Sequence, residues 1–332
     1  MIKDIPIASL AFFASFLSVL LAGPKVIAFM HRLKYGQTIN SYLEESHKAK
    51  QGTPTMGGIL FLIGVAVSLI VSIVCVPAVR ATGMLDILVL ALVFVLHMAI
   101  GFTDDYLSIK RGKNLGLKAR EKLVAQIVIA FSFAFYIFAN SPADGPREMM
   151  IGPDHVLRMP QMLYAFLVGI LMISMSNFTN LTDGLDGLAS GLGLLVVTGL
   201  AAYASYMHPE VALFGWALAG SLVGFLVYNG NPAKIFMGDT GSLALGSTFT
   251  AMAILARSEL VFLAFSLVFI AEGLSVVLQV ASFKTTGKRI FLMSPLHHHF
   301  EKLGWTESRI VLRFWIAGII SLWLGMLLEQ RF

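Results

Sequence analysis

The feature that most constrains this chain is a series of apolar blocks, each about as long as a membrane-spanning helix. Hydrophobic residues make up 57% of the 332 residues and charged residues only 13%, far from the usage of soluble globular domains. A helix needs about 20 apolar residues to cross a bilayer, where it satisfies its own backbone hydrogen bonds. No segment has the short alternating pattern of a membrane β-barrel. The sequence therefore predicts an all-α polytopic membrane protein.

The apolar blocks between polar breaks predict ten membrane spans. No segment between them is long enough to fold as a separate soluble domain, so residues 1–332 are expected to form a single integral-membrane domain. The spans are expected near residues 5–30, 56–78, 85–103, 123–139, 161–179, 188–207, 211–229, 242–256, 260–283 and 311–328.

The basic residues predict the orientation of these spans. In or beside four loops, near 31–55, 104–122, 230–241 and 284–310, lie 18 of the 24 Lys and Arg residues. Cytoplasmic loops carry an excess of Lys and Arg, so these loops are expected in the cytoplasm and both termini outside. The positive cluster that follows the first block also favours a retained helix over a cleaved signal peptide.

Acidic and histidine residues gather at the predicted cytoplasmic ends of the spans. Each alone has an ordinary explanation as a solvated helix end or a helix cap. Their convergence on one side of the membrane makes that explanation weaker for the group as a whole. The group consists of Asp104, Asp105, Asp183, Asp186, Asp239, His297, His298 and His299.

These residue types indicate chemistry on phosphates. Carboxylate oxygens are natural ligands of Mg²⁺, which also binds substrate phosphates, and the ligand spacings of zinc sites are absent. Gly238 and Gly241 allow a turn that presents backbone N–H groups to a phosphate. Basic loop residues suit an anionic partner, although membrane topology alone would explain them. They include Lys48, Lys50, Lys110, Lys113, Lys118, Arg120 and Lys122.

Five motifs carry a resemblance to a known family. They are GTPTMGG at 52–58, GFTDDY at 101–106, NFTNLTDGLDGLA at 177–189, YNGNPAKIFMGDTGS at 228–242 and PLHHHFE at 295–301. Through nearly its whole length the chain resembles the phospho-N-acetylmuramoyl-pentapeptide-transferase family, a branch of the polyprenyl-phosphate N-acetylhexosamine-1-phosphate transferases. Many members carry a lysine three residues after the second aspartate, where this chain has Ser108. Lys110 is one candidate replacement, and the basic partner of the acidic pair is left open.

The resemblance implies a fold, an activity and a location. It implies ten transmembrane helices, a homodimer in the bacterial inner membrane and an active site on the cytoplasmic face. The implied reaction transfers phospho-MurNAc-pentapeptide from UDP-MurNAc-pentapeptide to undecaprenyl phosphate, with Mg²⁺ as cofactor. It gives lipid I and UMP in the first membrane step of peptidoglycan synthesis. Membrane lipid is an expected partner, and nucleic acid is not.

The resemblance also implies roles for individual residues. Asp104 is expected to accept a proton from the lipid phosphate, while Phe236 and Asp186 are expected to bind uracil. A direct attack by the lipid phosphate is favoured over a covalent aspartyl intermediate. The implied catalytic residues are Asp104, Asp105, Asp239 and His298, with Asp239 and Asp105 as metal ligands. The implied substrate-binding residues are Lys48, Lys50, Lys122, Asn180, Asp183, Gly184, Leu185, Asp186, Asn229, Phe236, His297 and His299.

Three other functions were weighed against this one. A sister transferase would use UDP-GlcNAc on the same lipid, and the HHHFE motif argues against it. A secondary transporter would bind ions near the membrane midplane, but most of the acids lie at one interface. Only Glu272 is placed deep in an apolar block, where it is expected to pair inside the bundle. An intramembrane aspartyl protease would need a glycine at Phe236.

Overall fold

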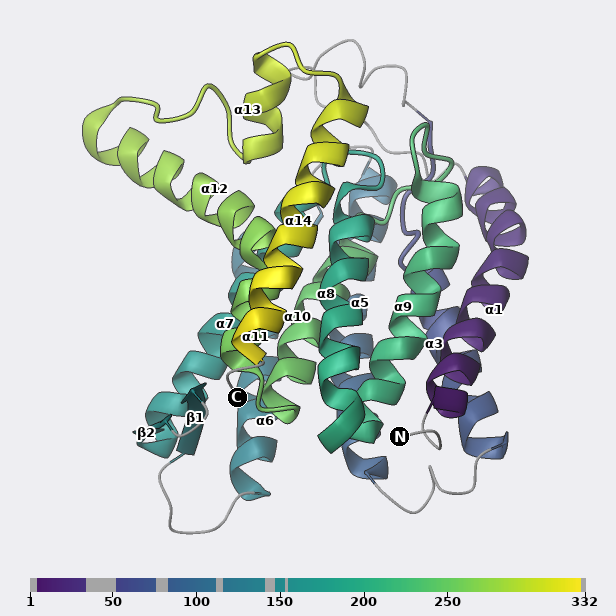
Figure 1. The fold of residues 1–332 in the computed structure, drawn as a ribbon. Coiled ribbons are helices and arrows are strands. Elements are labelled where there is room, and N and C mark those ends of the chain that lie inside the picture. Colours follow the sequence, from purple (N-terminus) through teal and green to yellow (C-terminus); the bar gives the residue numbers. More distant parts are fainter. Residues whose placement is uncertain are drawn as a thin grey trace.

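The computed structural model describes residues 5–33, 52–75, 83–111, 116–140, 147–152 and 155–329, and these are almost entirely helical. Figure 1 shows a bundle in which α1 begins and α14 ends at the same end, with α13 at the opposite end. The helices are α1 (Ile5–Arg32), α3 (Ile59–Cys75), α5 (Met84–Arg111), α6 (Ala119–Ala139), α7 (Gln161–Thr182), α8 (Leu188–Met207), α9 (Pro209–Asn229), α10 (Gly238–Leu255), α11 (Glu259–Phe265), α12 (Leu267–Thr286), α13 (Leu296–Lys302) and α14 (Glu307–Glu329).

The prediction of a polytopic helical membrane protein is confirmed. Within the described residues, eight helices are long and apolar enough to cross a membrane, namely α1, α5, α6, α7, α8, α9, α12 and α14, and α3 is a shorter apolar helix. The all-α prediction misses one antiparallel hairpin, formed by β1 (Arg147–Gly152) and β2 (His155–Met159). Its strands lie between the predicted spans at 123–139 and 161–179.

Helix α10 lies inside the bundle although it is rich in glycine, serine and threonine. It packs against α5 and α7, and every residue from 240 to 254 is buried. The hydroxyl groups of Ser247, Thr248 and Thr250 donate to carbonyl oxygens one turn earlier in the same helix, at 2.6–3.2 Å. These side chains therefore need no polar partner from another helix, and a polar helix can occupy the centre of the bundle.

The predicted ninth span, near 260–283, is wrong as a single helix. The chain forms α11 and α12 instead, separated at Ser266, whose backbone has φ −97° and ψ 9°. In Figure 1, α12 leans away from the bundle beyond this break. The break therefore lets α12 carry α13 back over the end of the bundle.

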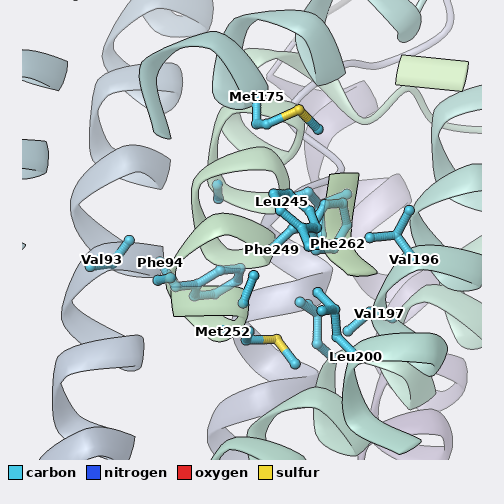
Figure 2. Close-up of a cluster of buried hydrophobic side chains, with 14 of the residues drawn as sticks. Val93, Phe94, Met175, Val196, Val197, Leu200, Leu245, Phe249, Met252 and Phe262 are labelled. Carbon is cyan, nitrogen blue, oxygen red and sulfur yellow. The ribbon is translucent and has the colours of Figure 1, made fainter. Parts of the chain in front are cut away.

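Large apolar side chains fill the interior and also cover the outside of the bundle. Figure 2 shows the interior around α10, where Phe249 and Met252 meet side chains of α5, α8 and α11. On the outer helices, Leu21 is 73% exposed and Phe135 is 69% exposed. An apolar outer surface of this kind suits lipid rather than water.

Candidate functional site

Three segments distant in sequence meet where α10 begins. A Cβ atom on Gly101 of α5 would lie 2.0 Å from the carbonyl oxygen of Asp239, and one on Gly58 would lie 2.3 Å from the backbone nitrogen of Gly241. The loop before α3 also pairs with the segment before α10, since Gly57 N–H donates to the carbonyl of Phe236 at 2.8 Å. Glycines thus bring the PTMGG, GFTDDY and GDTGS motifs into direct backbone contact.

Asp105 binds the first turn of α10. Its Oδ2 accepts hydrogen bonds from the backbone N–H of Thr240 at 3.0 Å and from the Thr240 hydroxyl at 2.6 Å, and its Oδ1 accepts from Asp239 N–H at 3.3 Å. From Gly238 and Gly241, this turn is expected to offer N–H groups to a phosphate. That expectation is wrong for these two amides, because a carboxylate already takes them at the positive end of the helix dipole.

Asp104 and Asp239 share one ammonium group. The Nζ atom of Lys122, in the first turn of α6, lies 2.9 Å from Oδ1 of Asp104 and 2.5 Å from Oδ2 of Asp239. Asp104 Oδ1 also accepts from the backbone N–H of Leu117 at 2.8 Å. Lys122 is therefore the basic partner of Asp104 within the acidic pair, while Lys110 is exposed near the end of α5.

The other oxygen of Asp239 is held by α7. The side-chain amide of Asn180 donates to Asp239 Oδ1 at 2.7 Å and to Ser242 Oγ at 2.9 Å. Asp183 follows directly after α7, and its burial, together with the carboxylates of Asp239 and Asp105, raises its pKa well above the ordinary value. Carboxylates therefore crowd the site around Lys122, and the raised pKa favours the protonated, neutral form of Asp183.

This cluster has the donor set of a divalent-cation site. Among the residues that the structure describes, Asp104, Asp105 and Asp239 offer carboxylate oxygens that all lie within 4.8 Å of one another. Oxygen ligands of this type suit Mg²⁺ rather than softer metals. The residues present could therefore hold a metal ion, and a cation would relieve the repulsion among the carboxylates.

A second polar cluster ties the NLTDGLDG loop between α7 and α8 to its neighbours. Asn229 is 2% exposed; its Oδ1 accepts from Ser190 Oγ at 2.6 Å and from Gly187 N–H at 3.2 Å, and its amide donates to the carbonyl of Ile235 at 3.0 Å. Gly187 has φ +77°, a conformation that favours glycine. Asn229 therefore fixes the backbone conformation of the loop where it enters α8.

Asp186 in the same loop is bound on both its side chain and its backbone. Its Oδ2 accepts from Ala233 N–H at 2.9 Å and from the Asn231 side chain at 3.2 Å. Its own N–H donates to Oε1 of Glu307 at 2.7 Å. Glu307, in the first turn of α14, thus joins the cluster, whereas Leu185 is an apolar side chain buried to 4% exposure.

The three histidines of α13 have different surroundings. His297 is fully buried, and its Nδ1 lies 3.2 Å from Oε1 of Glu272. His298 Nδ1 lies 2.5 Å from Oε2 of Glu301, and His299 Nδ1 accepts from Leu292 N–H at 3.2 Å. His297 lies against the NLTDGLDG loop, because a Cβ on Gly184 would lie 2.3 Å from its Nε2.

Comparison with known proteins places this arrangement in a family. Residues 87–257 match the model of glycosyl transferase family 4, and residues 50–62 match phospho-N-acetylmuramoyl-pentapeptide-transferase signature 1. The phospho-N-acetylmuramoyl-pentapeptide-transferases of Bacillus subtilis and Oceanobacillus iheyensis are each 42% identical, over 95% of both chains. That of Heliobacterium modesticaldum is 44% identical over 94% of both. The chain belongs to the phospho-N-acetylmuramoyl-pentapeptide-transferase family.

The two matched stretches cover most of the motifs that form the site. The stretch matched to the glycosyl transferase model holds the five acidic residues, and the signature covers the PTMGG loop that pairs with the start of α10. The histidine motif lies beyond both stretches. Of the residues implied by the resemblance, Lys48 and Lys50 lie outside the described residues.

Sequence reasoning missed several residues that position the site of this family member. Gln126 of α6 is 1% exposed, and it bonds to Ser176 Oγ at 3.2 Å and accepts from the Asn177 amide at 2.9 Å. Lys122 and Gln126 are four residues apart, so they share a face of α6. The local signal for this face was present in the spacing, but an apolar block with two polar residues does not say which neighbour they meet.

Proposed function

We propose that this chain transfers phospho-MurNAc-pentapeptide from UDP-MurNAc-pentapeptide to undecaprenyl phosphate, giving lipid I and UMP with Mg²⁺ as cofactor. The observation that carries the proposal is the cluster of Asp104, Asp105 and Asp239 around Lys122. It lies in a chain that belongs to a family named for this transfer. Peptidoglycan synthesis is the process that the reaction serves.

The chemistry requires an attack on phosphorus. An oxygen of the lipid phosphate forms a bond to the sugar-bearing phosphorus of the UDP-sugar, and the bond from that phosphorus to the UMP oxygen breaks. In such transfers, proteins act mainly by positioning the groups and stabilising charge. Direct attack is favoured over an aspartyl intermediate because the lipid phosphate is already an anionic nucleophile.

Asp104 is the proposed acceptor of the proton that the lipid phosphate still carries. The bonds that the structure gives to Asp104 within the described residues both fall on Oδ1, from Lys122 and Leu117, so Oδ2 is the oxygen assigned to the proton. The demand is modest, because the second pKa of a phosphate monoester is near 6. His298, paired with Glu301, is proposed to donate to phosphate oxygens.

Asp239 and Asp105 are proposed to hold Mg²⁺, whose charge stabilises the pyrophosphate and the departing UMP. Asp239 is proposed as the better ligand of the two. Within the described residues each of its oxygens accepts one bond, from Lys122 or Asn180, whereas Oδ2 of Asp105 accepts two and its Oδ1 a third. Lys122 contributes a second positive charge beside the same oxygens. Its proposed task is to keep the carboxylates and the substrate phosphates together without repulsion.

The nucleotide is proposed to bind along the NLTDGLDG loop. Phe236 offers an aromatic face for uracil, and base stacking on an aromatic ring is worth roughly 1–3 kcal/mol in single-strand binders. The other residues assigned to this side are Lys48, Lys50, Asn180, Asp183, Gly184, Leu185, Asp186, Asn229, His297 and His299.

The membrane arrangement belongs to the same proposal: a single domain of ten spans in the bacterial inner membrane, both termini outside, a cytoplasmic site and a homodimer.

The experiment that tests this function measures UMP release by the detergent-purified protein with undecaprenyl phosphate and Mg²⁺. UDP-MurNAc-pentapeptide and UDP-GlcNAc are supplied in parallel reactions. The expected result is turnover with the first nucleotide-sugar alone. Turnover with the second alone would assign the chain to a sister transferase, and turnover with neither would overturn the proposal.

A further inference from the structure

A carboxylate and an imidazole are buried together between α12 and α13. Glu272 and His297 are both fully buried. Oε1 of Glu272 accepts from the backbone N–H of His297 at 3.2 Å and lies 3.2 Å from its Nδ1. One carboxylate oxygen therefore holds both the backbone and the ring of the same residue. Ionisable groups are costly in a membrane-spanning helix and usually mark function.

The edge of the imidazole ring that carries Nε2 lies against the NLTDGLDG loop. A Cβ on Gly184 would lie 2.3 Å from His297 Nε2 and 2.9 Å from Cε1, closer than real side chains approach. Nε2 and the second oxygen of Glu272 are both buried without a hydrogen-bond partner among the described residues. The ring thus fills the space beneath Gly184, and any side chain at position 184 would push the ring and the loop apart.

The acceptor fixes the role of each atom in the pair. With Glu272 as acceptor, Nδ1 of His297 carries a proton and the ring is held in one orientation. An apolar pair would fill the same volume but would leave the His297 backbone N–H without this acceptor and would let the ring rotate.

We infer that Glu272 is a positioning residue for nucleotide binding. It holds His297 beneath Gly184 and so fixes the position of the NLTDGLDG loop. The contacts from Glu272 through His297 to Gly184 reach Asp183, the residue before Gly184, and Asp186, two residues after it. Glu272 need not touch the substrate, which agrees with its full burial. The inference rests on the proposed function, which assigns this loop to the nucleotide.

The test compares two buried glutamates changed in the same way. Glu272→Gln keeps the shape of the side chain and removes its charge. Glu259→Gln is the matched control, because Glu259 is 4% exposed, accepts from the Tyr164 hydroxyl at 2.6 Å and lies where α11 begins, beyond the far end of α10. For each protein, KM is measured for both substrates, and UMP binding is measured by calorimetry in the same detergent.

The expected result is a selective loss on the nucleotide side. Glu272→Gln should raise the KM for UDP-MurNAc-pentapeptide and the Kd for UMP about tenfold, as for residues that orient metal ligands. The KM for undecaprenyl phosphate should stay within about twofold, because the loop is assigned to the other substrate. Glu259→Gln should leave all three constants unchanged. A folded Glu272→Gln protein with unchanged nucleotide constants would overturn the inference.

If Glu272→Gln does not fold, a second variant tests the positioning role of Glu272. Gly184→Ala leaves the pair intact but places a methyl group against His297 Nε2, so it should give the same selective rise in the nucleotide constants. Equal changes for both substrates would instead indicate general damage and would count against the inference. Failure of the proposed function is distinguishable, because the wild-type protein would then release no UMP with either nucleotide-sugar.

Discussion

The ammonium nitrogen of Lys122 lies 2.5 Å from Oδ2 of Asp239, although 117 residues separate them in the sequence. The same nitrogen lies 2.9 Å from Asp104. One residue of α6 therefore joins an acid near the end of α5 to an acid at the start of α10. The three side chains can meet because α10 is packed against α5 and lies beside the α6–α7 pair.

Replacing Lys122 with methionine should lower turnover by about 100-fold, the usual cost of losing one preorganised electrostatic contact. The side chain keeps its length while the charge beside Asp104 and Asp239 is lost. The Mg²⁺ concentration that gives half-maximal activity should fall, because the carboxylates lose a competing cation. Steady-state assays over a Mg²⁺ titration measure both effects, with Lys122→Arg as the variant that keeps the charge. Full activity of Lys122→Met would remove this residue from the site.

Asp239→Asn should abolish Mg²⁺-dependent turnover while the protein remains folded, because the amide is a poor ligand for Mg²⁺ and keeps the shape of the side chain. Asp86→Asn is the matched control. It changes an acid in the first turn of α5, where Asp86 accepts from the Tyr136 hydroxyl at 2.5 Å, about 27 Å along the helix from Asp104. UMP release and thermal unfolding are measured for both variants. Wild-type activity of Asp239→Asn would exclude it as a metal ligand.

Gly101→Ala should destabilise the protein, since the added methyl group would lie 2.0 Å from the carbonyl oxygen of Asp239. Overpacking of this kind costs about 1–3 kcal/mol. Gly169→Ala in α7 is the control, because the nearest atom to its added Cβ would be 3.8 Å away, and alanine there favours the helix. Thermal unfolding in detergent should show a lower Tm for the first variant only. Equal Tm values would mean that α5 and α10 can separate freely.

Asn229→Ala should weaken nucleotide binding and lower the free energy of unfolding. The change leaves the carbonyl of Ile235 and the N–H of Gly187 buried without their partner. Each such group costs about 1–3 kcal/mol. Ser247→Ala is the control, because that hydroxyl bonds only within its own helix. Unfolding and UMP binding are measured together, and an Asn229→Ala protein that matches the control in both would contradict the prediction.

The candidate site divides into what local sequence patterns predict and what they cannot. The acids at one end of the spans were predicted because hydropathy and Lys/Arg counts place every loop on one side or the other. The role of Asp105 at the first turn of α10 was not, since an acidic pair at a helix end gives no sign of which helix it meets. Glu307 gave only the ordinary signal of an acid in a first helical turn.

The sequence by itself determined the class of polytopic helical membrane protein and the family, because these follow from block length, composition and motifs that are local in the chain. Only the tertiary structure decided that Lys122 is the basic partner of the acids, that the ninth apolar block breaks at Ser266 and that Glu272 holds His297 beneath Gly184. These pairings depend on how each helix is rotated and how closely glycines let two backbones approach. Contacts between residues far apart in the chain leave no local pattern from which they could be read.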